Sequence, residues 1–188
     1  MENFAMLADE SKKNRTITDI EALPEGERAE LIDGEMFMMA TPSITHQRIS
    51  RNLFMDISNY ISSKGGSCEP FYAPFSVFPD ESGINYLEPD LAVVCSPEII
   101  DDKGIHGGPD WVIEIVSPSS KYMDYVRKLS AYEKAGVREY WIVDPDKRIV
   151  TVYGLQSQSV EQYSFDEDIP AGIYKDLVLR IRIESMRL

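Results

Sequence analysis

Histidine and cysteine are scarce in this chain of 188 residues, which has only two of each. His46 and His106 are too few for the histidine cluster that a zinc peptidase needs. Cys68 and Cys95 lack CxxC spacing, which argues against a structural zinc site and predicts two buried thiols rather than a disulfide. Any metal chemistry in this chain is therefore expected to use oxygen ligands.

Long apolar runs are missing as well, since no stretch approaches the roughly 20 residues that span a bilayer. The first 15 residues mix acidic and basic side chains without an apolar core, so neither a secretory signal nor a transit peptide is visible. We therefore expect a cytoplasmic protein with no membrane partner, in which residues 1–15 are flexible.

Positive charge is in short supply, with 19 Lys and Arg against 32 Asp and Glu and a net charge of −13. This balance opposes nonspecific adhesion to nucleic acid. Residues 121–150 differ, because their seven basic and five acidic side chains sum to +2. One face can therefore meet an anion, although solvated surface charges explain the same pattern.

The length fits a single domain, residues 1–188. Turn signals and apolar periodicity predict its elements in order: a helical turn at residues 18–23, a β-hairpin at 29–39 around Asp33-Gly34, a helix that Ser43 caps and Gly65 ends, strands at 68–78, 90–95 and 111–116, a helix at 121–135, strands at 140–143 and 148–153, and two or three further strands. Residues 79–88 and 96–109 read as loops. This is the pattern of an α/β domain with a mixed sheet.

Two acids stand in apolar runs that read as buried strands, Asp90 before Leu91-Ala92-Val93-Val94 and Glu114 within Trp111-Val112-Ile113-Glu114-Ile115. A buried carboxylate costs several kcal/mol unless a partner offsets it. If the two strands are neighbours, a shared divalent cation, Mg²⁺ or Mn²⁺, suits both acids and directs attention to phosphoryl chemistry. A turn-capping role for Asp90 is the alternative.

Lys128 is the third candidate, on the predicted helix after the third strand and four residues after Asp124. That spacing lets the carboxylate orient the ammonium, which would stabilise a charged phosphate or help deprotonate water. A surface ion pair is the plainer interpretation. Glu30, in the hairpin, and His46, in the first turn of the long helix, are weaker candidates: Glu30 can equally face outward, and His46 can reach a phosphate or simply cap the helix.

A set of strings in a fixed order resembles the Uma2 family, which is assigned to the PD-(D/E)XK nuclease superfamily. They are AELIDGE at residues 29–35, HQRI at 46–49, EPDL at 88–91, GPDWVIEIVSPSS at 108–120, and the stretch from Lys128 to Pro145. The resemblance covers about Ile17 to beyond Tyr153. It implies a restriction endonuclease-like fold with an αβββαβ core, preceded by an N-terminal β-hairpin and followed by extra C-terminal strands.

The resemblance also implies roles. Asp90 and Glu114 would bind the metal, and Glu30 would be an additional acid of the family. Where the motif has lysine, two residues after the second acid, this chain has Val116. The role of that lysine would pass to Lys128, with Lys121 as the fallback. Lys121 and His46 would contact the substrate.

Three functions compete at this stage. The first is a metal-dependent endonuclease that hydrolyses phosphodiester bonds in DNA, with Mg²⁺ or Mn²⁺ as cofactor. The second is a nuclease fold without catalysis that binds nucleic acid or protein. The third is a metal-free hydrolase with Asp90 and Glu114 as acid and base. A symmetric homodimer would let two sites act on one duplex.

Overall fold

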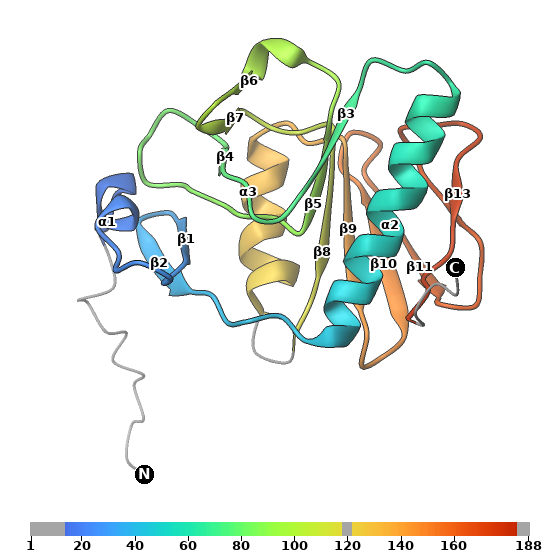
Figure 1. Ribbon diagram of the computed structural model, residues 1–188, viewed down its shortest axis with the longest axis horizontal. Helices are drawn as coiled ribbons and strands as arrows, with labels where there is room; N and C mark the ends of the chain where they lie inside the picture. Colours follow the sequence, from blue (N-terminus) through green and yellow to red (C-terminus); the bar gives the residue numbers. More distant parts are fainter. Residues whose placement is uncertain (1–13, 118–121, 184–188) are drawn as a thin grey trace.

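The computed structural model describes residues 14–117 and 122–183, and its centre is a six-stranded sheet (Figure 1). The strands are β3 (Glu69–Tyr72), β5 (Leu91–Val94), β8 (Trp111–Ile115), β9 (Glu139–Asp144), β10 (Ile149–Gly154) and β11 (Ser159–Ser164). They lie in the order β11-β10-β9-β8-β5-β3. β8 and β9 are parallel, and the other neighbouring pairs are antiparallel. This mixed sheet confirms the predicted α/β class.

One face of the sheet packs against α2 (Ile44–Ser63). Ser43 caps the helix, since its hydroxyl accepts the backbone N–H of His46 at 3.2 Å. Four apolar side chains spaced at four residues are buried against the sheet: Ile49, Leu53, Ile57 and Ile61. The predicted helix, its cap and its apolar stripe are confirmed.

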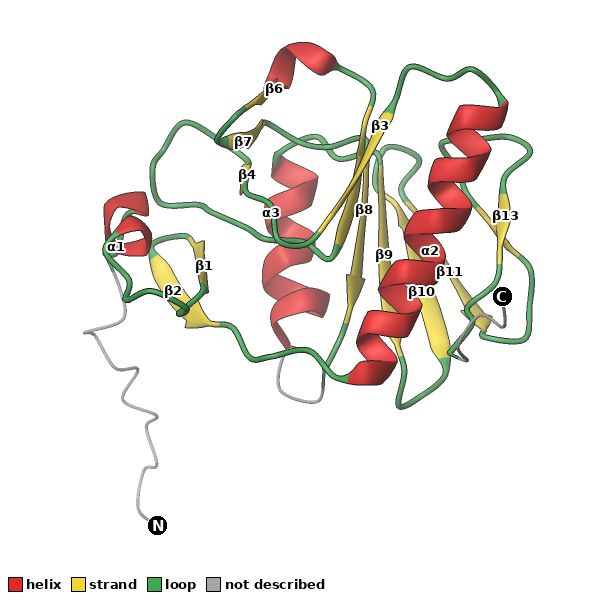
Figure 2. Ribbon diagram, in the orientation of Figure 1, coloured by secondary structure: helices red, strands yellow, loops and turns green. Residues whose placement is uncertain are grey.

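The other face packs against a π-helical turn, η3 (Met123–Lys128), which continues into α3 (Leu129–Lys134). Figure 2 shows α2 and α3 as the two long red ribbons beside the sheet. Tyr132 of α3 packs with Val112, Tyr140 and Ile142 of the strands. The sequence predicts this helix but not its π-helical first turn.

The hairpin consists of β1 (Ala29–Ile32) and β2 (Glu35–Met38), preceded by α1 (Ile17–Glu21). Asp33 and Gly34 have φ angles of 50° and 74°, as the predicted type I′ turn requires. Leu31 exchanges two backbone hydrogen bonds of 2.8 Å with Tyr86, so the hairpin is fixed to the segment before Asp90.

Two predicted segments differ from the structure. Residues 68–78 form two strands, β3 and β4 (Val77–Phe78), because β3 pairs with β5 in the central sheet whereas β4 belongs to a second sheet. Residues 96–109 contain η2 (Pro97–Ile99), β6 (Ile100–Asp101) and β7 (Gly104–His106), which complete a small sheet of order β4-β7-β6. Gly104 permits this close approach, because a Cβ there would collide with Ser76.

Cys68 and Cys95 form a disulfide, so the prediction of two thiols is wrong. β3 and β5 pair with Glu69 opposite Val94, and the same register places the two cysteines directly opposite each other. Their Cα atoms are 4.0 Å apart. The sequence alone does not reveal this register.

The C-terminal part adds β10 and β11 to the sheet and a small ribbon of β12 (Ile169–Pro170) and β13 (Val178–Leu179). No helix in the described residues is long and apolar enough to cross a membrane. The expectation of a flexible segment at residues 1–15 falls mainly on residues 1–13, which lie outside the described part of the chain.

Candidate active site

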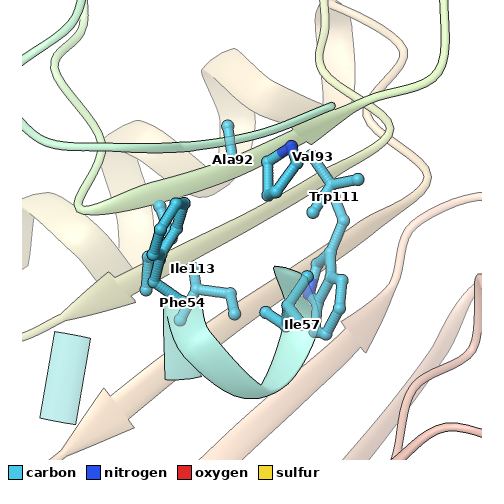
Figure 3. Close-up of a pocket in the computed structure, with 8 residues that line it drawn as sticks. Phe54, Ile57, Ala92, Val93, Trp111 and Ile113 are labelled. Carbon is cyan, nitrogen blue, oxygen red and sulfur yellow. The ribbon is translucent and has the colours of Figure 1, made fainter. Parts of the chain in front are cut away.

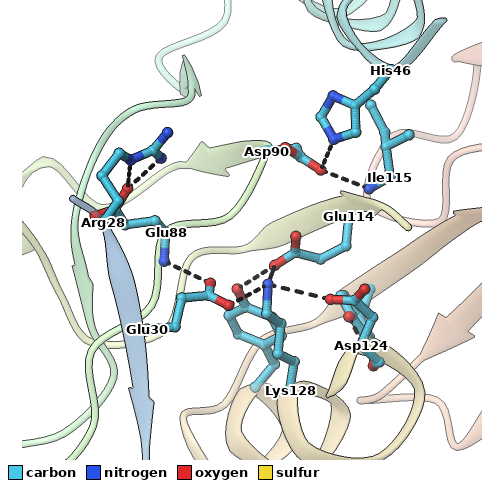
Figure 4. Close-up of polar contacts among 11 residues, drawn as sticks. Arg28, Glu30, His46, Glu88, Asp90, Glu114, Ile115, Asp124 and Lys128 are labelled. Carbon is cyan, nitrogen blue, oxygen red and sulfur yellow. Dashed lines mark hydrogen bonds and ion pairs between the residues drawn. The ribbon is translucent and has the colours of Figure 1, made fainter. Parts of the chain in front are cut away.

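Asp90 and Glu114 occupy opposite positions on two neighbouring chain segments. Leu91 lies opposite Ile113 in the β5–β8 pair, and the same register places Asp90, one residue before β5, opposite Glu114. Glu114 shares its side of β8 with Val112, which packs toward Tyr132 of α3. The two acids that the sequence selects therefore meet at one end of the β5–β8 pair (Figure 4).

The carboxylate of Asp90 is held through one of its oxygens. Oδ2 accepts the backbone N–H of Ile115 at 2.8 Å and lies 3.0 Å from Nε2 of His46. Oδ1 accepts no hydrogen bond from the described residues. The side chain keeps 17% of its surface exposed. The contacts to Oδ2 thus fix the orientation of the carboxylate, and Oδ1 remains available to a ligand.

Glu114 belongs to a buried cluster of charges centred on Lys128. The ammonium of Lys128 lies 2.9 Å from Oε2 of Glu30, 3.0 Å from Oε1 of Glu114 and 3.3 Å from Oδ1 of Asp124. All four side chains are at most 7% exposed. A lysine has three N–H donors, so these three acids can accept all of them. We call Glu30, Glu114, Asp124 and Lys128 the acid–lysine cluster.

The π-helical turn η3 supplies two members of this cluster. Asp124 and Lys128 are both buried within it, although Val126 between them is 49% exposed. Tyr140 supports the turn, because its hydroxyl donates to the backbone carbonyl of Asp124 at 3.0 Å. Single π-helical turns inside helices are frequent at functional sites.

Glu30 links the cluster to the hairpin and to the segment before Asp90. Its Oε1 accepts the backbone N–H of Glu88 at 3.0 Å, while Oε2 contacts Lys128. Glu88 in turn accepts Nε of Arg28 at 2.7 Å and the hydroxyl of Tyr86 at 2.8 Å. Glu30 thus points inward, and the alternative of an outward-facing acid does not hold.

Burial sets the protonation of the cluster. It raises the pKa of Glu114 well above its usual range, with Asp124, Glu30 and Asp90 adding to the rise and Lys128 opposing it. Burial likewise raises the pKa of Glu30 against the pull of Lys128. For Lys128, burial lowers the pKa, but Glu114, Glu30 and Asp124 outweigh it and hold the pKa well above the ordinary lysine value. Lys128 is therefore a permanent cation at neutral pH.

The residues present fit a cation with few protein ligands. The acid–lysine cluster places three carboxyl groups around a single ammonium. Oε2 of Glu114 and Oδ1 of Asp90 accept no hydrogen bond from the part of the chain that the structure describes. Within residues 14–117 and 122–183, no group of three or more His, Cys, Asp or Glu side chains is arranged to hold a metal. Mg²⁺ suits such a pair, because it keeps several waters.

The apolar pocket of Figure 3 lies between α2, β3, β5 and β8, and none of these acids lines it. Its lining includes Phe54, Ile57, Pro70 and Trp111, and it leaves no room for a water molecule. A narrow apolar gap of this kind offers a charged substrate nothing to bind, so we assign it to packing.

Not every candidate from the sequence is placed here. Lys121, the fallback lysine, lies outside the described residues. His46 contacts Asp90, and its contact with substrate stays a prediction. Tyr132 was not foreseen: its hydroxyl donates to Oε1 of Glu114 at 2.9 Å. In the sequence Tyr132 reads only as part of an apolar helical face, and nothing there signals its hydroxyl.

Comparisons with known proteins found similarity to a family and to a solved structure. A family model described as "Uma2: Putative restriction endonuclease" matches residues 17–180. A solved structure, "a putative nuclease belonging to DUF820 from Anabaena variabilis ATCC 29413", is 25% identical, with a TM-score of 0.69 and coverage of 88% of this chain and 94% of that one. A search of curated proteins found no match.

Proposed function

The chain belongs to the Uma2 family, and on that premise we propose that it is a metal-dependent endonuclease that hydrolyses phosphodiester bonds in DNA. One observation carries the proposal: Asp90 and Glu114 lie opposite each other, each with one oxygen held by donors of the protein. The other two oxygens, Oδ1 of Asp90 and Oε2 of Glu114, are left to bind a ligand. Because the acids around the site outnumber the one lysine, a cation suits those oxygens better than an anion does.

Asp90 and Glu114 would hold Mg²⁺ or Mn²⁺, which when bound supplies a Lewis acid for the phosphate and an activated water. The chain's own residues have to orient these two carboxylates. The N–H of Ile115 does so for Asp90 at 2.8 Å, and the hydroxyl of Tyr132 does so for Glu114 at 2.9 Å.

Lys128 contributes positive charge rather than a base. Its pKa is held well above the ordinary value by its three acids after burial has lowered it, so it does not take a proton from water at neutral pH. Of the two roles that the sequence leaves open, stabilising charge on the phosphate is the one that fits. Asp124 makes the longest of the three contacts, at 3.3 Å, so it is the partner that the ammonium of Lys128 would most easily exchange for a phosphate oxygen. Glu30 keeps the ammonium in place.

Lys121 and His46 are proposed to meet the phosphates of the substrate. A homodimer is also proposed. The chain has a net charge of −13, so its positive potential is confined to a small region, and a symmetric pair of sites would bring two such regions to one duplex. Light scattering tests this part, and a monomer in the presence and absence of DNA overturns it.

A cleavage assay tests the function. Plasmid and single-stranded DNA are incubated with the wild-type chain in Mg²⁺, Mn²⁺ or chelator, beside Asp90→Ala and Glu114→Gln. Asp101→Asn is the matched control, because Asp101 is an exposed aspartate that also pairs with a histidine, His106, at 3.0 Å.

We expect cleavage that needs the cation, is lost in Asp90→Ala and Glu114→Gln, and survives in Asp101→Asn. Cleavage by a folded Asp90→Ala, or cleavage in chelator, overturns the proposal. DNA binding without cleavage under either cation would instead favour the second function, a nuclease fold that only binds nucleic acid.

A further inference from the structure

His46 belongs to α2, which packs on the face of the sheet opposite to η3 and α3, and it contacts Asp90. It lies in the first turn of α2, where Ser43 fixes its backbone N–H at 3.2 Å. Its Nε2 is 3.0 Å from Oδ2 of Asp90, the oxygen that also accepts the N–H of Ile115. Figure 4 shows the imidazole edge directed at this carboxylate. The pair joins α2 to the start of β5.

The environment of the ring selects one tautomer. The side chain of His46 is 14% exposed, and its Nδ1 is buried without a hydrogen-bond partner among the described residues. A proton on Nδ1 would therefore be a buried donor with no acceptor, which is costly. A proton on Nε2 has Asp90 as its acceptor. The neutral ring with hydrogen on Nε2 satisfies this arrangement.

Two donors on Oδ2 restrict how the carboxylate of Asp90 can turn. The N–H of Ile115 comes from β8 and the imidazole comes from α2, so rotation of the carboxylate would break one contact or the other. The helix itself is held by the burial of Ile49 and Leu53 against the sheet. The N-terminus of a helix also favours a negative charge nearby. The two contacts on Oδ2 leave Oδ1 as the oxygen without a hydrogen bond from the described residues.

We propose that His46 is a positioning residue for the cation site: it donates from Nε2 to Oδ2 of Asp90 and thereby presents Oδ1 to the metal. This inference rests on the proposed function, because it assigns Asp90 to the cation. It goes beyond a contact between His46 and substrate, since it predicts an effect before any DNA is present. Partners that orient a metal ligand are typically worth about 10–100-fold in metal affinity.

The tautomer is tested without metal. In ¹⁵N-labelled, metal-free protein at mildly alkaline pH, the ring nitrogens of His46 should report hydrogen on Nε2 and a bare Nδ1. Asp90→Asn should alter the Nε2 signal, and Asp101→Asn should leave it unchanged. Hydrogen on Nδ1 in the wild type overturns the proposal whether or not the protein binds metal.

The closing experiment measures Mn²⁺ binding by calorimetry in the absence of DNA. His46→Leu removes the donor, while His46→Gln restores an amide N–H near the position of Nε2. His106→Leu is the matched control, because His106 pairs with Asp101 at 3.0 Å on the surface, where its side chain is 47% exposed. Circular dichroism and thermal melts establish that each variant is folded.

We expect His46→Leu to bind Mn²⁺ about 10–100-fold more weakly, His46→Gln to recover most of that loss, and His106→Leu to match the wild type. Wild-type affinity in His46→Leu, or no recovery in His46→Gln, overturns the positioning role and leaves the proposed function standing. A wild-type chain that binds no Mn²⁺ overturns both, and the DNA cleavage assay then fails as well.

Discussion

The ammonium of Lys128 lies 3.0 Å from Oε1 of Glu114, across 14 residues of sequence. The position where the superfamily motif has its lysine, Val116, is 4% exposed and packs in the apolar core with Tyr132 and Val137. The helix therefore supplies the charge that the strand does not. The π-helical turn that carries Lys128 also carries Asp124, and both side chains are buried.

Removing the lysine should be costly to stability. Lys128→Met leaves Glu30, Glu114 and Asp124 buried together without a counter-charge, and breaking a buried ionic group in this way costs about 3–5 kcal/mol. Urea unfolding at neutral pH with chelator present measures the loss. Lys134→Met is the control, since Lys134 is exposed at the end of α3 and should change the free energy of unfolding by less than about 0.5 kcal/mol.

The loss of unfolding free energy in Lys128→Met should shrink on acidification, because Glu30 and Glu114 then become neutral and no longer need the ammonium. A loss in Lys128→Met of under about 1 kcal/mol at neutral pH would contradict the burial of the cluster.

Glu114 should make the wild type less stable as the pH rises. Burial raises its pKa in the folded state above the usual value of 4.5, so between the usual and the raised value the folded chain binds more protons than the unfolded chain. Stability is then highest at the acidic end of that window and falls as the pH rises through it. Glu114→Gln removes this dependence. We expect it to flatten the slope by up to about 1.4 kcal/mol per pH unit.

Chemical unfolding of both proteins across this pH range, in chelator, provides the measurement. If the free energy of unfolding of the wild type and of Glu114→Gln changed with pH in parallel, the pKa of Glu114 would be the same in the folded and unfolded chain. Glu21→Gln serves as control, because Glu21 is exposed in α1.

Local signals in the sequence predicted the elements whose cause is local. Asp33-Gly34 specifies the turn of the first hairpin, and the four-residue spacing of Ile49 and Leu53 specifies the buried face of α2. The division of residues 68–78 depends instead on partners: β3 pairs with β5, and β4 pairs with β7. No periodicity within the segment shows which neighbours each half will find.

The candidate site likewise has some features that are visible in the sequence and others that depend on tertiary contacts. An acid within an apolar run is visible in the sequence, so Asp90 and Glu114 could be selected. The spacing from Asp124 added Lys128, and the family resemblance assigned roles to Lys128 and Glu30. The contacts that organise these acids are tertiary. The N–H of Ile115 and the hydroxyl of Tyr132 reach them only after β8 pairs with β5 and α3 packs on the sheet.

The disulfide should be a main source of stability. Cys68 and Cys95 are 27 residues apart, and closing a loop of this length stabilises a chain by about 3–4 kcal/mol in the entropic model. The double variant Cys68→Ala, Cys95→Ala should lose this amount in urea unfolding. Reductant should lower the stability of the wild type to a similar extent and leave the double variant unchanged. A wild type that is insensitive to reductant, with two free thiols by alkylation and mass spectrometry, would contradict the disulfide.

Binding of Mg²⁺ should raise the melting temperature of the wild type. A ligand present at 100 times its Kd stabilises the folded state by about 2.7 kcal/mol, which corresponds to roughly 5–10 °C for a chain of this size. The reason is specific to this site: the cation would offset the burial, and secondarily the repulsion from neighbouring acids, that raise the pKa of Glu114, and it would fill the open oxygen of Asp90. Asp90→Asn should lose most of the shift, and Asp101→Asn should keep it. A shift of equal size in Asp90→Asn would place the cation elsewhere on this acidic surface, whereas no shift in any variant at saturating Mg²⁺ would remove the cation from the proposed mechanism.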